Sequence, residues 1–429
     1  MRRELPIRKS LKIPTSLNPS QPLITGAATR QSYTGRPSAL AQVALAAGLL
    51  LGSPAFTQLL PPALYPLDPA PLAMAVGDVN NDGRPDLVVS RLGTELGIQI
   101  LLQLEDGTFE PSAAFPGEFT RSVDVGDFNN DGLLDVVRGH PDGIQLYVQN
   151  GAGELVENQP LPSDERGALV RIGDFNQDGL DDVVSVPDGS DAEVVYIYLQ
   201  GVTGLEAPIT YPLNHGDSSN DVEVGDLNGD GLDDIVVVSP FRPSQDNIAV
   251  LYQDPDGGFL DQVLYDAPGN RTYDGVAIGD LNDDGLNDLA LAPIGPWVHI
   301  FLQNQDGVLE FLDIFNFGSQ GLHDSMEIRD FDGDGLNEIV GVSVQQLVVL
   351  TSPAHPGGVQ VAQAIDLGGG VNFFFNKHHL YCADINGDGL QDAAVANNEL
   401  GAQVFLGDGT LFADGFEGGD TTSWSVSFP

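Results

Sequence analysis

One nine-residue pattern, Asp-x-Asn-x-Asp-Gly-x-x-Asp, occurs seven times in this 429-residue chain with small variations. The first copy runs from Asp78 to Asp86, and the first aspartates of successive copies are 49, 47, 52, 54, 50 and 54 residues apart. A repeat of about 50 residues indicates one structural unit copied along the chain rather than several unrelated domains. The regular spacing therefore limits the possible folds to repeat architectures.

Each acidic pattern lies between short apolar segments. Ahead of it, apolar residues occupy the fourth and second places before the first aspartate, as Val123 and Val125 do before Asp127. This alternation with a period of two is typical of a β-strand. An apolar run such as Ile235-Val-Val-Val follows each pattern, and two more strand-like segments complete the unit.

Four strands per unit, repeated radially, predict an all-β fold: a seven-bladed β-propeller with four antiparallel strands per blade and the acidic loop between strands 1 and 2. The seventh unit has three clear strands. We expect residues 58–68, which resemble the fourth strand at 209–214, to supply the missing outer strand and close the ring. The alternative is that residues 410–416 complete this blade. Closure hides sheet edges that would otherwise promote aggregation.

The acidic pattern has the chemistry of a calcium loop. Positions 1, 3, 5 and 9 carry oxygen side chains, position 7 offers a backbone carbonyl, and glycine at position 6 permits a sharp turn. Ca²⁺ prefers six to eight oxygen ligands, and each loop supplies most of them. With one site per loop, we expect up to seven Ca²⁺ ions. The predicted ligands are Asp78, Asn80, Asp82, Arg84 and Asp86; Asp127, Asn129, Asp131, Leu133 and Asp135; Asp174, Asn176, Asp178, Leu180 and Asp182; Asp226, Asn228, Asp230, Leu232 and Asp234; Asp280, Asn282, Asp284, Leu286 and Asp288; Asp330, Asp332, Asp334, Leu336 and Glu338; and Asp384, Asn386, Asp388, Leu390 and Asp392.

Other metal motifs do not match. An EF-hand needs flanking helices and a glutamate at position 12, whereas the flanks here are strands and position 12 is never glutamate. No His/Cys set typical of zinc accompanies the loops. The sixth loop departs from the others at Asp332 and Glu338. We expect the ions to act mainly as structural staples, because clustered carboxylates repel one another without a cation.

In these residues the chain resembles the FG-GAP/VCBS-repeat family, over residues 58–413. The resemblance implies a propeller whose calcium loops join the first two strands of each blade, as in integrin α-subunits. The Phe-Gly…Gly-Ala-Pro framing is weak in this chain, so the VCBS-like bacterial branch is the nearer likeness.

The charge is unevenly distributed. The formal net charge is −45, and residues 1–55 hold seven of the 17 basic residues and a single acid, Glu4. The strongly acidic remainder argues against nucleic acid as a partner. The apolar run at 39–51 is too short to span a bilayer and resembles the core of a secretion signal, although an uncleaved anchor is an alternative.

We therefore expect residues 1–55 to be a signal peptide or disordered leader, 56–413 to be the propeller, and 414–429 to be a tail, either a sorting segment or a disordered end. We expect an exported chain of bacterial origin, either secreted or at the cell surface or periplasm. We also expect it to be monomeric and without a transmembrane span once mature. Its single cysteine, Cys382, excludes an intrachain disulfide and lies at an apolar strand position.

The face opposite the acidic loops is the expected ligand surface. Seven of the ten basic residues after position 55 fall in loops predicted on that face, and aromatic and histidine side chains join them. The alternative is that basic residues simply avoid the acidic loops. The candidates are Arg121, Arg138, His140, Arg242, Arg271, Trp297 and Lys377.

A second set of charged residues is predicted near the central axis. Asp124, Arg171 and Glu223 occupy equivalent places in consecutive units, with Glu327 and Tyr381 in the sixth and seventh. We expect a structural ion-pair network in which Arg171 bridges Asp124 and Glu223. No catalytic residue set is recognised.

The sequence thus predicts a binding or adhesion module for a glycan or protein ligand. The alternative is a calcium-dependent polysaccharide lyase or hydrolase on the same scaffold, an argument from fold alone.

Overall fold

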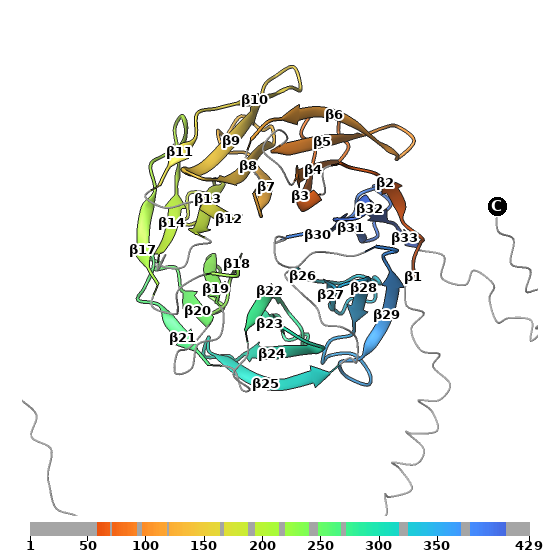
Figure 1. The fold of residues 1–429 in the computed structure, drawn as a ribbon. Helices are drawn as coiled ribbons and strands as arrows, with labels where there is room; N and C mark the ends of the chain where they lie inside the picture. Colours follow the sequence, from red (N-terminus) through yellow and green to blue (C-terminus); the bar gives the residue numbers. More distant parts are fainter. Residues whose placement is uncertain are drawn as a thin grey trace, which may run out of the picture. The chain divides into compact units, whose positions relative to one another are not determined.

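The computed structural model describes residues 58–68, 71–91, 97–117, 120–163, 167–187, 194–213, 219–239, 248–266, 272–316, 325–369 and 378–408. Within these residues the regular structure consists of β-strands and contains no helix. Seven main antiparallel sheets are arranged around a common centre as the blades of a β-propeller (Figure 1), as the repeat spacing predicts. None of the described residues forms a helix long and apolar enough to cross a membrane.

Each blade is listed from its inner to its outer strand. Blade 1 is β3 (Pro71–Gly77), β4 (Asp86–Arg91), β5 (Ile98–Gln103) and β6 (Phe109–Phe115); blade 2 is β7 (Val123–Gly126), β8 (Asp135–His140), β9 (Gly143–Gln149) and a divided outer strand, β10 (Leu155–Glu157) and β11 (Leu161–Pro162); blade 3 is β12 (Gly167–Gly173), β13 (Asp182–Pro187), β14 (Val194–Tyr198) and β17 (Ile209–Pro212).

Blade 4 is β18 (Asp221–Gly225), β19 (Asp234–Val238), β20 (Ile248–Leu251) and β21 (Val263–Tyr265); blade 5 is β22 (Tyr273–Gly279), β23 (Asp288–Pro293), β24 (Trp297–Gln303) and β25 (Leu309–Asn316); blade 6 is β26 (Met326–Arg329), β27 (Glu338–Val342), β28 (Gln346–Leu350) and β29 (Val361–Asp366); blade 7 is β30 (Leu380–Ala383), β31 (Asp392–Asn397), β32 (Gly401–Phe405) and β2 (Ala63–Tyr65). Two small pairs, β15 (Gln200–Gly201) with β16 (Gly204–Leu205) and β1 (Gln58–Leu59) with β33 (Gly407–Asp408), complete the pairing.

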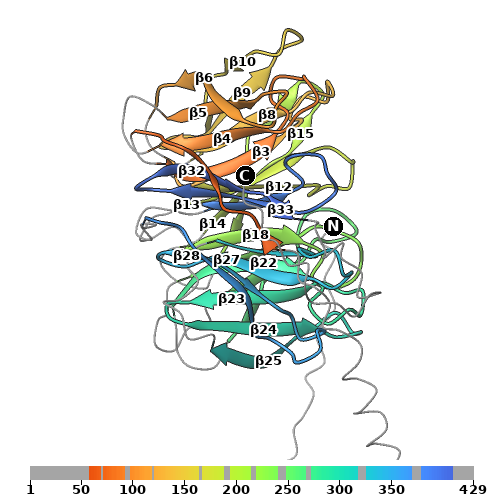
Figure 2. The same cartoon turned by 90° about the vertical axis from the view of Figure 1, so that its right-hand side faces the viewer.

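The outer strand of blade 7 comes from the start of the described chain. β2 pairs antiparallel with β32, with Leu64 opposite Gln403, and β1 pairs with β33 beside it. Figure 1 shows this red segment against the blue end of the chain, and Figure 2 shows the same strands from the side. The prediction that residues 58–68 close the ring is confirmed, while the alternative strand at 410–416 lies outside the described residues.

The apolar cores lie between neighbouring blades rather than inside one. In blade 1, Met74 and Val76 face blade 7, whereas Ala73 and Ala75 on the other face of the same strand contact blade 2. Seven such clusters of buried residues follow one another around the ring. Because each blade buries both faces against its neighbours, a single blade lacks a core of its own.

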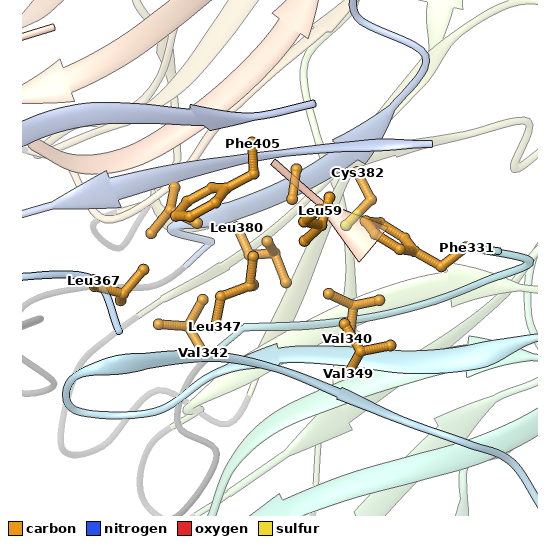
Figure 3. Packing of buried hydrophobic residues seen from close by; sticks show 12 residues of the cluster. Leu59, Phe331, Val340, Val342, Leu347, Val349, Leu367, Leu380, Cys382 and Phe405 are labelled. Atoms are coloured by element: carbon orange, nitrogen blue, oxygen red, sulfur yellow. The ribbon is translucent and has the colours of Figure 1, made fainter. Parts of the chain in front are cut away.

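The cluster between blades 6 and 7 includes the closing segment. Leu59 of β1 lies among Phe331, Leu380, Cys382 and Phe405 (Figure 3) and is 4% exposed. Cys382 is a free, buried thiol in this cluster, as its apolar strand position predicts. Burial among apolar side chains raises the pKa of the Cys382 thiol well above its usual value, so it stays neutral.

Leu59 and Leu64 provide a matched test of the closing segment. We expect Leu59→Ala to lower the free energy of unfolding by about 2–5 kcal/mol, the usual cost of truncating a buried leucine. Leu64 is 44% exposed on the adjacent strand, so Leu64→Ala should change it by less than about 0.5 kcal/mol. Urea unfolding followed by tryptophan fluorescence measures both. Equal effects of the two substitutions would contradict the observed docking.

Candidate functional site

All seven acidic loops join strand 1 to strand 2 of their blade, which is the connection that the sequence predicts. In blade 2, for example, the loop 127–135 leaves β7 at Gly126 and enters β8 at Asp135, and these two residues are paired across the strands. Since the blades share one strand order, the seven loops lie at equivalent ends of the seven sheets. All 35 predicted metal-site residues fall within the described part of the chain.

The loop backbone depends on left-handed residues at two positions. The glycines at position 6 have φ between 77° and 91°, a region that glycine occupies without steric cost. Position 4 is also left-handed in every loop; it is a glycine in loops 4, 6 and 7 and a residue such as Asn81 or Asp283 in the others. These two reversals fold the short loop back on itself.

The folded loop directs backbone amides at the first carboxylate. In loop 1, Asp78 Oδ1 accepts the amide of Asp82 at 3.1 Å and Asp78 Oδ2 accepts the amide of Gly83 at 2.7 Å. Asn80 Oδ1 accepts the Asp82 amide at 2.9 Å, and Asp82 Oδ1 accepts the amide of Arg84 at 3.0 Å. Each ionised carboxylate still has lone pairs that these amides do not use.

The carboxylate at position 9 is the most buried part of each loop. Asp86 is fully buried; its Oδ2 accepts the amide of Val79 at 3.2 Å and its Oδ1 accepts the amide of Gln103 at 2.9 Å. Burial, with a smaller contribution from the negative charges of Asp82 and Asp78, raises the pKa of Asp86 to about 7. The equivalent acids in the other loops are also buried, and desolvation raises their pKa values to about 6 to 8.

A glutamine at the end of strand 3 connects neighbouring loops in blades 1 to 4. Its backbone amide donates to the position-9 carboxylate of its own blade, as the Gln149 amide does to Asp135 Oδ1 at 2.8 Å. Its side chain donates to a carbonyl in the loop of the preceding blade, as Gln149 Nε2 does to Asp78 at 3.2 Å and Gln253 Nε2 does to Asp174 at 2.7 Å. The loops are therefore linked along the ring as well as within each blade.

These loops offer a donor set suited to a hard cation: carboxylate and amide oxygens held close together by the backbone. In the sixth loop, one carboxylate oxygen from each of Asp330, Asp332 and Glu338 lies within 4.8 Å of the other two. Like charges so close together are costly without a counter-ion, especially with the position-9 acid out of solvent. The acidic groups could therefore hold a metal ion, and the all-oxygen donor sets of loops 1 to 5 and 7 fit Ca²⁺.

The predicted ligand face is described in part. Arg121 precedes β7, His140 ends β8, and Trp297 begins β24, all at the ends of the blades opposite the acidic loops. Arg242, Arg271 and Lys377 lie outside the described residues.

Arg138 does not contribute to an exposed surface. Its side chain is 2% exposed, Nε donates to the Tyr147 hydroxyl at 3.0 Å, and the guanidinium lies 5.9 Å from the centre of the Tyr147 ring. Strand alternation directs this arginine into the interior, where it packs against an aromatic ring.

The inner strands carry a charged cluster near the axis. Arg171 donates to Glu223 Oε1 at 2.8 Å from Nε and 2.5 Å from a terminal nitrogen, as an ion pair. The predicted bridge to Asp124 is not formed as a hydrogen bond; Arg171 instead contacts His378. Asp124 is desolvated, which raises its pKa to about 6 against the attraction of Arg171.

His378 joins this cluster to other blades, and these contacts were not predicted from the sequence. It precedes β30 of blade 7, with a left-handed φ of 58°. Its Nε2 lies 2.7 Å from Asp221 Oδ1 in blade 4, and its Nδ1 lies 2.7 Å from Ser122 Oγ in blade 2. Because the Arg171 guanidinium can only donate, Nδ1 is the acceptor and Nε2–H donates to Asp221. The imidazole of His378 therefore connects blades 2, 4 and 7 near the central axis.

A shallow depression lies on the loop side, between the acidic loops of blades 3 and 4. The residues that line it are Asp174, Gln177, Asp178, Gly179, Gly231, Leu232 and Asp233. It is a part of the acidic face.

Comparison with known proteins agrees with this geometry. The FG-GAP-like repeat matches residues 78–138, 127–185, 174–237, 226–291 and 280–341, which together make up more than half of the chain. The chain belongs to the FG-GAP-like repeat family. Each matched stretch begins at the first aspartate of one acidic loop and ends beyond the next loop, so it covers parts of two neighbouring blades.

Among curated proteins, integrin alpha-4 of Xenopus laevis is 24% identical over 146 residues, 29% of this chain. The chain spans 14% of the length of that relative. A solved lectin from Agrocybe aegerita, which recognises non-reducing terminal N-acetylglucosamine, has a TM-score of 0.51 at 19% identity, covering 72% of this chain and 81% of the lectin. BBS1N, solved in complex with ARL6DN, has a TM-score of 0.58 at 10% identity, covering 83% of this chain and 99% of its own. These structures share the fold with the family member described here.

The buried acids predict how the metal-free protein responds to pH. An unfolded aspartate titrates near pH 3.9, whereas burial raises the pKa of the position-9 aspartates in the folded state to about 6 to 7, as for Asp135 and Asp288. Between these values the folded state holds more protons than the unfolded state, so stability is present below about pH 4 and is lost as the pH rises through about 7. We expect the melting temperature in chelator to fall from pH 5 to pH 8. An unchanged or rising melting temperature over this range would contradict the assignment.

Proposed function

We propose that this chain is an exported calcium-binding propeller that acts as a binding or adhesion module for a glycan or protein ligand. The observation that carries the proposal is the set of buried position-9 carboxylates, one at the base of every acidic loop. A stable fold with so many desolvated acids near other carboxylates requires a counter-charge, and the FG-GAP-like loops offer oxygen ligands for one. Export is proposed from the basic, then apolar, leader at residues 1–55.

Calcium is the cation proposed for loops 1 to 5 and 7. These loops present carboxylate or amide oxygens at positions 1, 3, 5 and 9 and a carbonyl at position 7, and Ca²⁺ accepts such flexible oxygen sets. The sixth loop has a different set of neighbours.

Calcium titration tests the first half of the proposal. We expect Ca²⁺ to raise the melting temperature, since each site that binds the folded state alone adds about 2.7 kcal/mol at a free concentration one hundred times its Kd. Isothermal titration should show Asp135→Asn losing one ion per chain. The matched control is Asp142→Asn, an exposed acid outside the loops, which should keep the full number. Chelation without any change in melting temperature would contradict calcium binding.

The ligand surface is proposed on the opposite face. Arg121 and Trp297 place a cation and an aromatic ring in its loops, groups that suit sugars, carboxylates and peptides. The lectin with the same fold recognises a glycan, and integrin alpha-4 resembles this chain in sequence. Glycans and peptides are therefore both tested as ligands.

Glycan and peptide arrays probed with the full chain test this surface. We expect at least one class of ligand to be retained in Ca²⁺ and to be weakened about tenfold or more by Arg121→Ala or Trp297→Ala, as for anchor residues in other interfaces. Leu312→Ala on an outer strand is the control on another surface. Equal loss in the control would reject the opposite face. Turnover of a bound polysaccharide would identify a carbohydrate-active enzyme instead.

A further inference from the structure

Blade 6 differs from the other blades in several residues that meet at one place. Position 3 of its loop is Asp332 and position 9 is Glu338, which is one methylene longer than aspartate. Blades 1 to 5 end strand 3 with a glutamine and blade 7 with Gly407, but blade 6 has Ser352 there, followed by the turn Pro353-Ala-His355-Pro-Gly. His355 thus approaches the acidic loop from the turn that follows strand 3 of blade 6.

The turn holds His355 against the position-9 acid. Ser352 supplies two contacts to His355 Nδ1, the amide nitrogen at 3.1 Å and Oγ at 2.9 Å. The amide of Ala354 donates to the carbonyl of Leu281 in the fifth loop at 3.2 Å, which anchors the turn to the preceding blade. In the other six blades the residue equivalent to Ser352 donates its amide to the position-9 carboxylate; here the imidazole has taken that place.

Two buried atoms face one another at this point. His355 is 7% exposed and Glu338 is fully buried. His355 Nε2 lies 2.5 Å from Glu338 Oε1 and 3.9 Å from Asp334 Oδ2. Despite this distance, neither Nε2 nor Oε1 has a hydrogen-bond partner of acceptable geometry. Both atoms are polar, desolvated and aimed into the acidic loop.

The contact is not an ordinary hydrogen bond. The Ser352 amide donates to Nδ1, so the ring proton lies on Nε2, beside Glu338 Oε1. Nε2 and Oε1 nevertheless lack acceptable hydrogen-bond geometry. A metal ion that displaces the Nε2 proton would join the two atoms.

We propose that blade 6 holds a divalent transition-metal cation of the Zn²⁺ class, bound by His355 Nε2 with Glu338 and Asp334, rather than Ca²⁺. Imidazole nitrogen suits zinc and its neighbours, whereas Ca²⁺ prefers oxygen. With Nε2 bound to the metal, the ring proton would lie on Nδ1, where Ser352 Oγ can accept it, as partners of metal-bound histidines do. The proposal rests on the proposed function only in that the acidic loops bind cations.

The test is retention of zinc by the full chain in competition with calcium. The protein is loaded with Zn²⁺, dialysed against millimolar Ca²⁺, and its Zn and Ca contents are measured by mass spectrometry. We expect about one Zn²⁺ per chain to remain in the unmodified protein and none in His355→Gln. Asp306→Asn is the matched control: it removes an exposed acid at the equivalent place in the blade 5 turn and should keep the zinc.

Cobalt gives a second readout. Co²⁺ bound at the site should show visible absorption bands that are lost in His355→Gln and retained in Asp306→Asn. If His355→Gln does not fold, Glu338→Asp replaces it, because the shorter acid no longer reaches Nε2, and it too should lose the zinc. Loss of zinc to Ca²⁺ from the unmodified protein, or retention by the folded variant, overturns the proposal. The calcium content of the same samples reports on the other loops independently.

Discussion

The buried carboxylate at position 9 is the interaction on which the blade depends. Asp135 stands at the start of strand 2, and its two oxygens bind an amide of its own loop and the amide that ends strand 3. One side chain thus sets the loop and the register of the two strands behind it. This side chain is a desolvated carboxylate close to other carboxylates, which is unfavourable without a counter-charge. The residue that organises the blade therefore also creates the need for a cation.

The ring follows from a different constraint, the burial of both faces of every blade. Apolar side chains alternate between the preceding and the following blade, so each core is shared by two sheets. No blade can satisfy its surfaces until the last one contacts the first. The contribution of β1 and β2 to blade 7 meets this requirement, because the first and last strands of the described ring become parts of one cooperative unit.

Most of the fold could be predicted because it follows from local sequence patterns. Contacts between residues far apart in the sequence could not be predicted. Blade number, the position of the acidic loops and the closing strand follow from spacing, period-two alternation and glycine turns. His378 could not be placed, since its partners Ser122 and Asp221 are far away in sequence and meet it only in the closed ring. Arg138 was expected on the surface because it is charged. Its place in the strand alternation instead directs its side chain into the interior.

The repeat makes such departures informative. In six blades a strand-3 amide donates to the position-9 acid. In blade 6, the longer acid, the missing glutamine and the histidine turn change together and meet at Glu338. Independent drift would leave unmatched groups at separate places. Three changes that converge on one pair of atoms are better explained by a different occupant, since a cation can bind the carboxylate oxygen that the strand-3 amide no longer contacts.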